Sequence, residues 1–373
     1  MNTPFGKLIE KSGFGTIFQM VVLVSVVCGA LMNGYAVGLL LGNFWLSGLV
    51  ALVYVVLGVL VLMQQKVMEK WINRRFETAM GFVSCFMIYD FMILLVWGIL
   101  ALAFSASQRG NAVGIIASDI LAALVVAVGY WHTRTIRTPA YSIDLGLGED
   151  YRIVLLSDIH LGVFVGEKHV RRMVETVNQL DADLVVISGD IIDVNNHILA
   201  DSQELSKISA LLRGMKAREG IYAALGNHDP SVENAVFRRF LQDAHIRLLH
   251  NEAVQLSCIN LIGRSDERRN HRCPIGEFAE QIDRSMPVVV LDHDPGKIPE
   301  AVAFGADLVL CGHTHKGQFF PVTYLTKWAN GKHYFYGHEV FGKTHAVICA
   351  GTGFFQLPVR LGTDNEAADI HLS

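Results

Sequence analysis

Residues 152–162 read RIVLLSDIHLG, and this stretch decides the fold. An apolar run ends there in two polar side chains, Asp158 and His160. The run shows no alternation of polar and apolar residues, which is typical of a strand covered on both faces. Such strands belong to α/β proteins with a substantially parallel sheet, and ligands bind there at the carboxyl ends of the strands.

The same pattern recurs four more times along the chain. Apolar runs end in polar motifs in the segments LVVISGDIID (184–193), IYAALGNHD (221–229), VVVLDHDP (288–295) and LVLCGHTH (308–315). Two further strands are expected at Ile259–Ile262 and Ala346–Ala350. The helices expected between strands are Lys168–Leu180, Ser202–Lys216, Val232–Asp243 and Ile275–Arg284. This alternation predicts an α/β domain over residues 141–373.

The polar groups at these strand ends are of types that bind metal ions. They are Asp158, His160, Asp190, Asn227, His293, His313 and His315. In an extended chain the side chains of residues two apart point the same way, so Asp158 and His160 can bind one ion together. Seven such groups exceed the need of one tetrahedral ion and suit two divalent cations, with Mn, Fe or Zn as candidates. A lone His or an N-cap Asp needs no function, but five successive strand ends carrying ligand types favour one.

In order along the chain, the motifs D-x-H, G-D-x-x-D, G-N-H-D, a single His and G-H-x-H resemble the calcineurin-like metallophosphoesterase superfamily. The resemblance covers about Tyr151 to Gln318, and the strings DIHLG and GHTHKGQ are similar to its bacterial, membrane-associated YkuE-like branch. It implies a β-sandwich with helices on both outer faces, a four-layer αββα arrangement. It also implies that the protein is a metal-dependent phosphohydrolase.

The resemblance further implies a role for each site residue. One metal would be held by Asp158, His160, Asp190 and His315, and the other by Asp190, Asn227, His293 and His313. Asp190 would thus bridge the ions. His228 would act as an acid paired with Asp193. Two cations can together deprotonate a bridging water at neutral pH and neutralise phosphoryl oxygens in the transition state.

Two further residues are candidates for contact with the substrate. Arg264 lies in an arginine-rich loop after a strand and could hold a phosphate group. Asp266 occupies a G-x-x-D stretch close by. A solvated basic loop is the alternative. The aromatic-rich stretch Phe319–Phe341 could line an apolar substrate groove, or it could be a covering hairpin.

Residues 1–140 differ sharply from the rest of the chain. They carry a net charge of +4 against −8 for residues 141–373, and none of the 15 histidines precedes His132. Four apolar runs of at least 20 residues, each long enough to cross a bilayer, occur at Thr16–Leu41, Phe44–Met63, Met80–Phe104 and Ala112–Trp131. The sequence therefore predicts a transmembrane four-helix domain over residues 1–140. Asp90 and Asp119 inside these runs mark either an ion path or groups bonded to each other or to Asn33.

Basic residues predict how the protein crosses the membrane. Eight lysines and arginines flank the runs on one side, and Arg109 alone lies on the other. Positive charge marks the cytoplasmic side, so we expect a multi-pass inner-membrane protein with both termini and the catalytic domain in the cytoplasm. Six cysteines without a CxxC pair do not form a disulfide framework.

The sequence as a whole predicts an integral-membrane phosphoesterase acting on a phosphomonoester, phosphodiester or pyrophosphate, and the membrane helices suggest the hypothesis of a lipid-linked substrate. The net charge of −4 is not the excess of positive charge that is typical of a protein that binds nucleic acid. One alternative is a non-catalytic metal or phosphate sensor that signals through the helices; His228 and Asp193, which a binder does not need, favour the enzyme. A transporter with a regulatory hydrolase domain would need more polar groups inside the membrane than this chain has.

Overall fold

The computed structural model describes residues 14–71, 74–193, 197–268 and 270–373. These residues form two compact units. One comprises Thr133–Phe355 and Arg360–Ser373, and the other comprises the helices that end at His132 together with Gln356–Val359. The predicted domain boundary at residue 140 stays a prediction.

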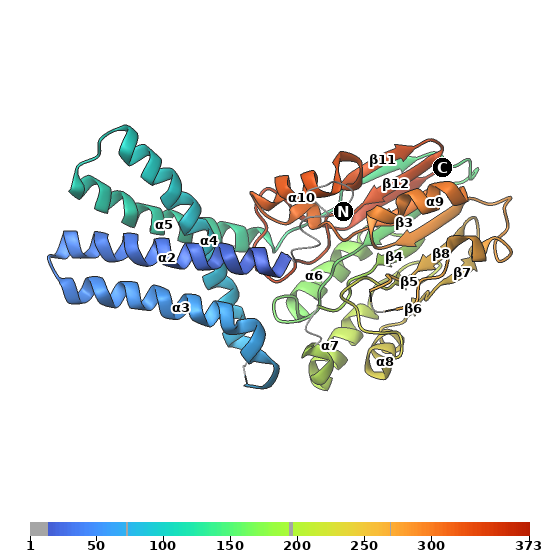
Figure 1. Ribbon diagram of the computed structural model, residues 1–373. Helices are drawn as coiled ribbons and strands as arrows, with labels where there is room; N and C mark the ends of the chain where they lie inside the picture. Colours follow the sequence, from blue (N-terminus) through green and yellow to red (C-terminus); the bar gives the residue numbers. More distant parts are fainter. Residues whose placement is uncertain (1–13, 72–73, 194–196, 269) are drawn as a thin grey trace. The chain divides into compact units, whose positions relative to one another are not determined.

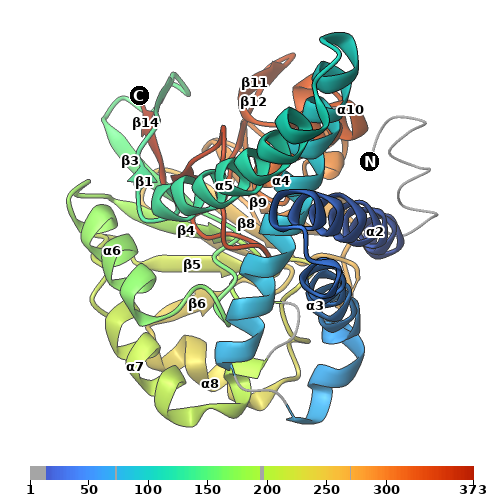
Figure 2. The same cartoon turned by 90° about the vertical axis from the view of Figure 1, so that its left-hand side faces the viewer.

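The helical unit contains four long helices, which Figures 1 and 2 show in blue and teal. They are α2 (Phe14–Leu41), α3 (Phe44–Trp71), α4 (Arg74–Ala103) and α5 (Gln108–His132). All four are long and apolar enough to cross a membrane, which confirms the number predicted. Two helices extend beyond the predicted apolar runs, because α3 continues past Met63 to Trp71 and α4 begins at Arg74, before Met80.

Polar side chains within these helices lie close to one another. The Tyr54 hydroxyl on α3 donates to Asp90 Oδ2 on α4 over 2.7 Å. Asp119 on α5 lies beside Asp90 and beside Asn33 of α2. The two carboxyl groups therefore meet inside the helical unit, in agreement with the reading in which they bond to each other or to Asn33.

The second unit is built on two six-stranded sheets packed face to face. The first has the strand order β2 (Ala140–Ile143), β14 (Ala368–Leu372), β3 (Tyr151–Leu156), β4 (Leu184–Ser188), β5 (Ile221–Ala224) and β6 (Ile246–Leu248). The second has the order β11 (Gly337–Phe341), β12 (Thr344–Ile348), β10 (Leu308–Cys311), β9 (Val288–Asp292), β8 (Asn260–Arg264) and β7 (Glu252–Gln255). A short parallel pair joins β1 (Ile136–Arg137) to β13 (Asn365–Glu366).

Helices cover the outer faces of both sheets (Figure 1). Over the first sheet lie α6 (Glu167–Asn178), α7 (Ser202–Leu212) and α8 (Ala235–Asp243). Over the second lie α9 (Ile298–Phe304) and the 3₁₀ turn η2 (Ile275–Phe278). The remaining elements are α10 (Val322–Asn330) and the 3₁₀ turns η1 (His197–Ala200), η3 (Pro295–Lys297), η4 (His315–Gly317) and η5 (Lys332–Tyr334). The αββα arrangement predicted from the resemblance is confirmed.

Burial explains why the strands lack alternation. On β3, Ile153 and Leu155 pack between the two sheets, whereas Val154 and Leu156 pack against the outer helices. All four side chains are fully buried. A strand in a central layer must be apolar on both faces, and the central strands β3, β4 and β5 pair in parallel. Their carboxyl ends therefore meet at one edge of the sandwich.

The sequence misplaced several elements outside these central strands. The helix expected at Ile275–Arg284 is only the short turn η2. Helices α9 and α10, the edge strands β2, β6, β7 and β11, and strand β14 between β2 and β3 were not predicted. Short edge strands carry few apolar residues, so hydrophobic pattern alone does not identify them. All six cysteines are free, as expected.

Candidate metal centre

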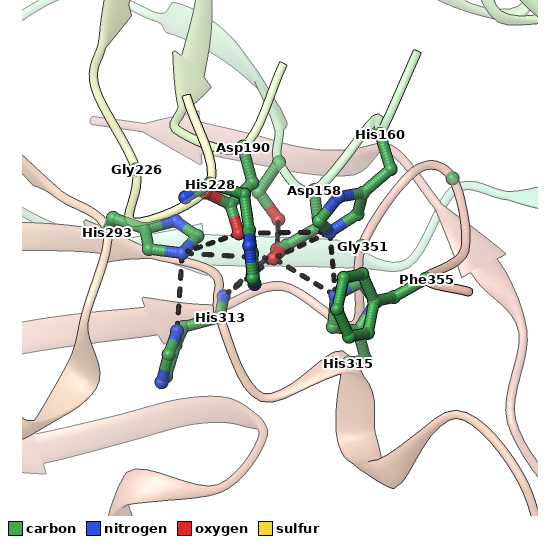
Figure 3. A network of polar contacts seen from close by, with 12 residues as sticks. Asp158, His160, Asp190, Gly226, His228, His293, His313, His315, Gly351 and Phe355 are labelled. Carbon is green, nitrogen blue, oxygen red and sulfur yellow. Dashed lines mark hydrogen bonds and ion pairs between the residues drawn. The ribbon is translucent and has the colours of Figure 1, made fainter. Parts of the chain in front are cut away.

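The seven predicted ligands lie together at the carboxyl ends of five strands. Asp158 and His160 follow β3, Asp190 follows β4, Asn227 follows β5, His293 follows β9, and His313 and His315 follow β10. Strands of both sheets contribute, so the residues meet at the end of the sandwich where the carboxyl ends of these five strands lie. Figure 3 shows the carboxylates and imidazoles of this set turned toward a common centre.

One group of ligand atoms surrounds Asp158. His160 Nε2 lies 3.1 Å from His315 Nε2, and His315 Nε2 lies 3.3 Å from Asp158 Oδ1. His160 Nε2 is also 3.7 Å from Asp190 Oδ2. These are the four residues that the family resemblance assigned to one ion.

A second group surrounds His293. Its Nε2 atom lies 3.2 Å from Asp190 Oδ2 and 3.1 Å from Asn227 Oδ1. His313 Nδ1 lies 2.8 Å from Asn227 Oδ1 and 3.3 Å from His293 Nε2. Asp190 Oδ2 is thus within 4 Å of ligand atoms in both groups.

The spacing of these atoms fits cations at their centres. Two nitrogen or oxygen ligands bound about 2.1 Å from one ion lie roughly 3.0–3.4 Å apart in octahedral or tetrahedral geometry. Three His or carboxylate groups gather closely enough to hold an ion in each of two sets, Asp158 with His160 and His315, and Asp158 with Asp190 and His293. Nitrogen and oxygen donors of this kind accept Mn, Fe or Zn.

Burial sets the charge state of the site. It lowers the pKa of His160 to about 3, and it lowers the pKa of His315 well below the usual range, so both rings are neutral and present lone pairs. Burial alone would raise the pKa of Asp190, but His293 and His160 beside it hold that pKa well below the usual range. Burial alone would lower the pKa of His293, but contact with Asp190 raises that pKa well above the usual range. A proton between His293 and Asp190 thus takes a place that a cation would fill.

The backbone is strained at the candidate ligands. Five of the seven have a positive φ angle, namely Asp158 (49°), His160 (52°), Asp190 (54°), His313 (72°) and His315 (50°). Positive φ is uncommon for residues other than glycine and clusters at functional sites. The strand ends are held in this conformation by the surrounding structure, which turns the side chains inward.

Two glycines let the loops approach the carboxylates. A Cβ atom on Gly226 would lie 2.2 Å from Asp190 Oδ1, and one on Gly312 would lie 2.3 Å from Asp158 Oδ2. Any larger residue would displace the ligand. Glycine is needed in G-N-H-D and G-H-x-H because the backbone there lies against a ligand carboxylate. Neither glycine has the positive φ angle that would make it necessary for a turn.

Hydrogen bonds orient the ligands from behind. His293 Nδ1 donates to the Ser188 carbonyl over 2.7 Å, which leaves Nε2 as the coordinating atom. Ser157 Oγ donates to Asp158 Oδ2 over 2.6 Å. Asp158 also accepts from the backbone N–H of His313.

The predicted acid, His228, borders the centre but is only half-buried. Its backbone N–H donates to Asp190 Oδ1 over 2.8 Å, and its ring lies 5.5 Å from that of His160. Burial lowers the pKa of His228 to about 4, so the ring is neutral at pH 7 before a substrate binds. Asp193 Oδ1 lies 3.7 Å from His160 Nδ1. The predicted pairing of Asp193 with His228 stays a prediction.

Arg264 is placed differently from the solvated loop that we considered. It ends strand β8, is 1% exposed, and forms ion pairs with Asp292 (3.3 Å) and Glu300 (2.7 Å). Asp292 precedes His293, so this guanidinium fixes the strand end that carries a candidate ligand. Asp266 is buried and accepts from the Arg268 N–H over 2.9 Å. A substrate role for either residue stays a prediction, and the placement of Arg264 does not favour it.

Three residues of the site were missed in the sequence. The Phe355 ring lies 4.7 Å from that of His228 and 4.9 Å from that of His160 (Figure 3). Asp229 accepts from the N–H groups of Ile191, Ile192 and Gly226, and so joins two ligand loops. Arg360 is fully buried and donates to the carbonyls of His315, Ala350 and Gly353. The G-N-H-D motif contains Asp229, whereas no pattern marks Phe355 or Arg360.

Comparisons with known proteins agree with this geometry. Residues 151–317 match the model of the calcineurin-like phosphoesterase family. An uncharacterized metallophosphoesterase of Aquifex aeolicus is 30% identical over 213 residues, which are 55% of this chain and 79% of that protein. The uncharacterized metallophosphoesterase YkuE of Bacillus subtilis is 27% identical over 271 residues, 68% of this chain and 93% of YkuE. The chain belongs to the calcineurin-like metallophosphoesterase family.

A membrane protein is also among the relatives. A "transmembrane protein with metallophosphoesterase domain" of zebrafish, Danio rerio, is 35% identical over 240 residues, 59% of this chain and 53% of that protein. The predicted family, including its YkuE-like and membrane-associated relatives, is confirmed. The chain spans 62% of the length of two Helicobacter pylori relatives and about half of the zebrafish protein.

Proposed function

We propose that this chain is an integral-membrane phosphoesterase that hydrolyses a phosphomonoester, phosphodiester or pyrophosphate at a dinuclear metal centre. One ion would be held by Asp158, His160, Asp190 and His315, and the other by Asp190, Asn227, His293 and His313. The observation that carries the proposal is that two groups of ligand atoms, with neighbouring atoms 2.8–3.7 Å apart, both include Asp190 Oδ2.

The charge balance of the site supports an anionic substrate. Of the seven groups, only Asp158 and Asp190 are carboxylates. Two divalent ions bring four positive charges, so the loaded centre keeps an excess of two that attracts a phosphate group. When bound, such ions activate a water at neutral pH and stabilise charge on phosphoryl oxygens.

The side chains of this chain would position the reactants. The Phe355 ring packs beside the rings of His228 and His160 and would exclude water from that side of the metal centre. His228 would hold the leaving oxygen by hydrogen bonding and pass it a proton. Because the His228 ring is neutral at pH 7 in the protein alone, the bound phosphate would have to supply the negative charge that raises its pKa.

A lipid-linked substrate and a cytoplasmic site extend this proposal. The four candidate membrane helices would keep the catalytic domain beside a bilayer, where a lipid phosphoester is concentrated. The distribution of Lys and Arg favours an inner membrane with the catalytic domain on its cytoplasmic side.

Hydrolysis by the full chain in detergent tests the proposal. We expect Mn²⁺-dependent release of nitrophenol from bis(p-nitrophenyl) phosphate or p-nitrophenyl phosphate, and no release with chelator. Asp190→Asn should abolish turnover, whereas Asp150→Asn, at an exposed position outside the site, should retain it. Metal analysis should give two ions per wild-type chain and fewer in Asp190→Asn.

The same experiment separates the enzyme from a sensor. A chain that binds two ions but hydrolyses neither nitrophenyl ester nor lipid phosphates and pyrophosphates would favour a non-catalytic sensor. A chain that binds only one ion would contradict the dinuclear centre, whatever its activity.

A further inference from the structure

Exposed apolar side chains gather at one place on the catalytic unit. Among the described residues from 133 to 373, six large hydrophobic side chains are exposed. Four of them belong to one short segment, namely Phe320 (46%), Tyr324 (67%), Leu325 (46%) and Trp328 (58%). Single exposed apolar residues are ordinary, but four on one segment mark an interaction surface. We call these four residues the α10 surface.

The α10 surface is firmly held. Tyr324, Leu325 and Trp328 share one face of α10, and the Phe320 ring packs edge-on against that of Tyr324 at 6.0 Å. On the buried side, Ala329 is 2% exposed. A Cβ atom on Gly317 would lie 2.4 Å from Thr323 Cα, so the backbone of α10 packs directly on the turn η4. Its exposure is therefore a property of the fold and does not come from a loose loop.

The chemistry of the segment fits a lipid surface. Residues 320–336 contain no Asp or Glu, and they include the exposed Lys327 and Lys332. Trp and Tyr concentrate at the level of lipid headgroups, and lysines beside them attract anionic lipids. The four candidate membrane helices would also hold the chain at a bilayer, which is an apolar partner. Tethering raises the effective concentration of that partner without any new contact.

A direct connection runs from this surface to the metal centre. The turn η4 contains His315 and leads into α10. Gln318, which follows η4, donates from Nε2 to the Phe355 carbonyl (3.1 Å) and accepts from the Phe355 N–H (2.7 Å). Phe355 in turn packs on His160 and His228. A bilayer against α10 would therefore lie beside the wall of the catalytic pocket.

We propose that the α10 surface inserts into the headgroup region of the bilayer and presents the metal centre to phosphoesters in the membrane. This proposal adds a membrane contact to the proposed function. Only its activity measurement rests on the proposed function, whereas the spin-label measurement does not. The partner is a lipid bilayer with anionic headgroups.

A spin label tests the contact without reference to activity. The full chain carrying Leu325→Cys would be labelled with a nitroxide and reconstituted in nanodiscs of phosphatidylethanolamine and phosphatidylglycerol. The control is Val236→Cys on α8, since Val236 is the same kind of exposed apolar residue (48%) outside the surface. The labelled wild type corrects for native cysteines.

We expect the label at 325 to be more accessible to oxygen than to a water-soluble nickel chelate, and the label at 236 to show the reverse. Equal accessibility of the chelate at both positions would overturn the proposal. Dipolar broadening at 325 would show a second copy in place of lipid. A label at 325 shielded from both agents would show a covering segment of protein, which also overturns it.

Activity supplies the second measurement. Leu325→Glu should raise KM for phosphatidic acid in vesicles about tenfold or more, because a charge replaces an inserted apolar side chain. Hydrolysis of bis(p-nitrophenyl) phosphate and all rates of Val236→Glu should be unchanged. An equal loss on both substrates would contradict a membrane role for α10. A wild type inactive on every substrate would instead contradict the proposed function and leave the spin-label result to decide this one.

Discussion

The Nε2 atoms of His160 and His315 lie 3.1 Å apart although burial keeps both imidazoles neutral. Two facing lone pairs repel unless a proton or a cation lies between them. Asp158 Oδ1, 3.3 Å from His315 Nε2, adds a carboxylate at the same place. Without metal, a hydrogen on one of the two nitrogens bridges the rings, and a divalent ion would replace it and bind both lone pairs and the carboxylate.

It follows that metal ions should stabilise the fold. A ligand at about 100 times its Kd adds about 2.7 kcal/mol of stability, which raises Tm by roughly 5 °C or more for a unit of this size. We expect thermal unfolding of the full chain in detergent to show this rise with Mn²⁺ over chelator. His315→Ala should lose much of it, and the exposed His371→Ala should keep it. An identical Tm with and without metal would contradict the assignment.

Replacing His228 should affect turnover more than metal binding. Its ring borders the centre but is absent from both groups of ligand atoms, and general acid–base groups contribute about 10²–10⁴-fold to rate. His228→Asn should lower kcat by a factor in this range and leave two ions bound. His245→Asn, at an exposed position, is the matched control. Loss of an ion in His228→Asn would show that His228 is a ligand after all.

Phe354 and Phe355 are neighbours with opposite roles. Phe354 is 4% exposed and belongs to the core beneath α6, whereas Phe355 is half-buried against the site histidines. Phe354→Ala should cost about 3–5 kcal/mol of stability. Phe355→Ala should leave Tm nearly unchanged and lower kcat about tenfold, because water enters beside His228. Equal destabilisation by both variants would show that Phe355 is an ordinary core residue.

The central strands and the ligand set could be predicted from sequence because each is local. A buried strand is a continuous apolar run, and a polar motif directly after it must lie at the sheet edge. Residues such as Arg360 and Phe355 could not be predicted, since their roles depend on contacts made across the fold. Arg360 is an isolated basic residue in the sequence, yet it reaches His315, 45 positions earlier, only in the folded chain.

Arg264 is a residue for which the sequence suggested a role that the structure does not favour. Its position beside a strand end suggested contact with phosphate, but the pairing with Asp292 and Glu300 depends on β9 and α9, which are distant in sequence. Helix α10 was missed because its exposed face is apolar, and the usual pattern of a helix with a polar outer face is absent. The feature that obscured α10 in the sequence is the one that points to a membrane surface.

Arg360 should be irreplaceable even by lysine. Its guanidinium donates to four backbone carbonyls through Nη1 and Nη2 and to Asn365 Oδ1 through Nε, at 2.5–3.3 Å. A lysine ammonium cannot reproduce this planar fork. We expect Arg360→Lys to lower the free energy of unfolding by about 3 kcal/mol and to reduce metal affinity by displacing His315. Arg238→Lys on the exposed face of α8 should change neither. Unaltered metal affinity in Arg360→Lys would contradict the link to His315.

Acid sensitivity should depend in part on His169, a buried residue outside the metal centre. Its Nε2 donates to the Thr352 carbonyl over 2.8 Å, and burial lowers its pKa from 6.5 to about 4. The unfolded chain therefore takes up a proton below pH 6.5 that the folded chain refuses until about pH 4. The stabilisation is complete above pH 6.5 and is lost as the pH falls through this window, by about 3 kcal/mol.

His169→Gln keeps a donor for Thr352 but does not titrate. We expect its Tm to fall less steeply than that of the wild type between pH 6.5 and 4, and the two slopes to agree above pH 6.5. Chelator in all samples removes the contribution of metal release. His371→Gln, at an exposed histidine, should follow the wild type, because solvent screens its charge in both states. A wild-type slope shared by His169→Gln would show that other buried histidines alone cause the acid sensitivity.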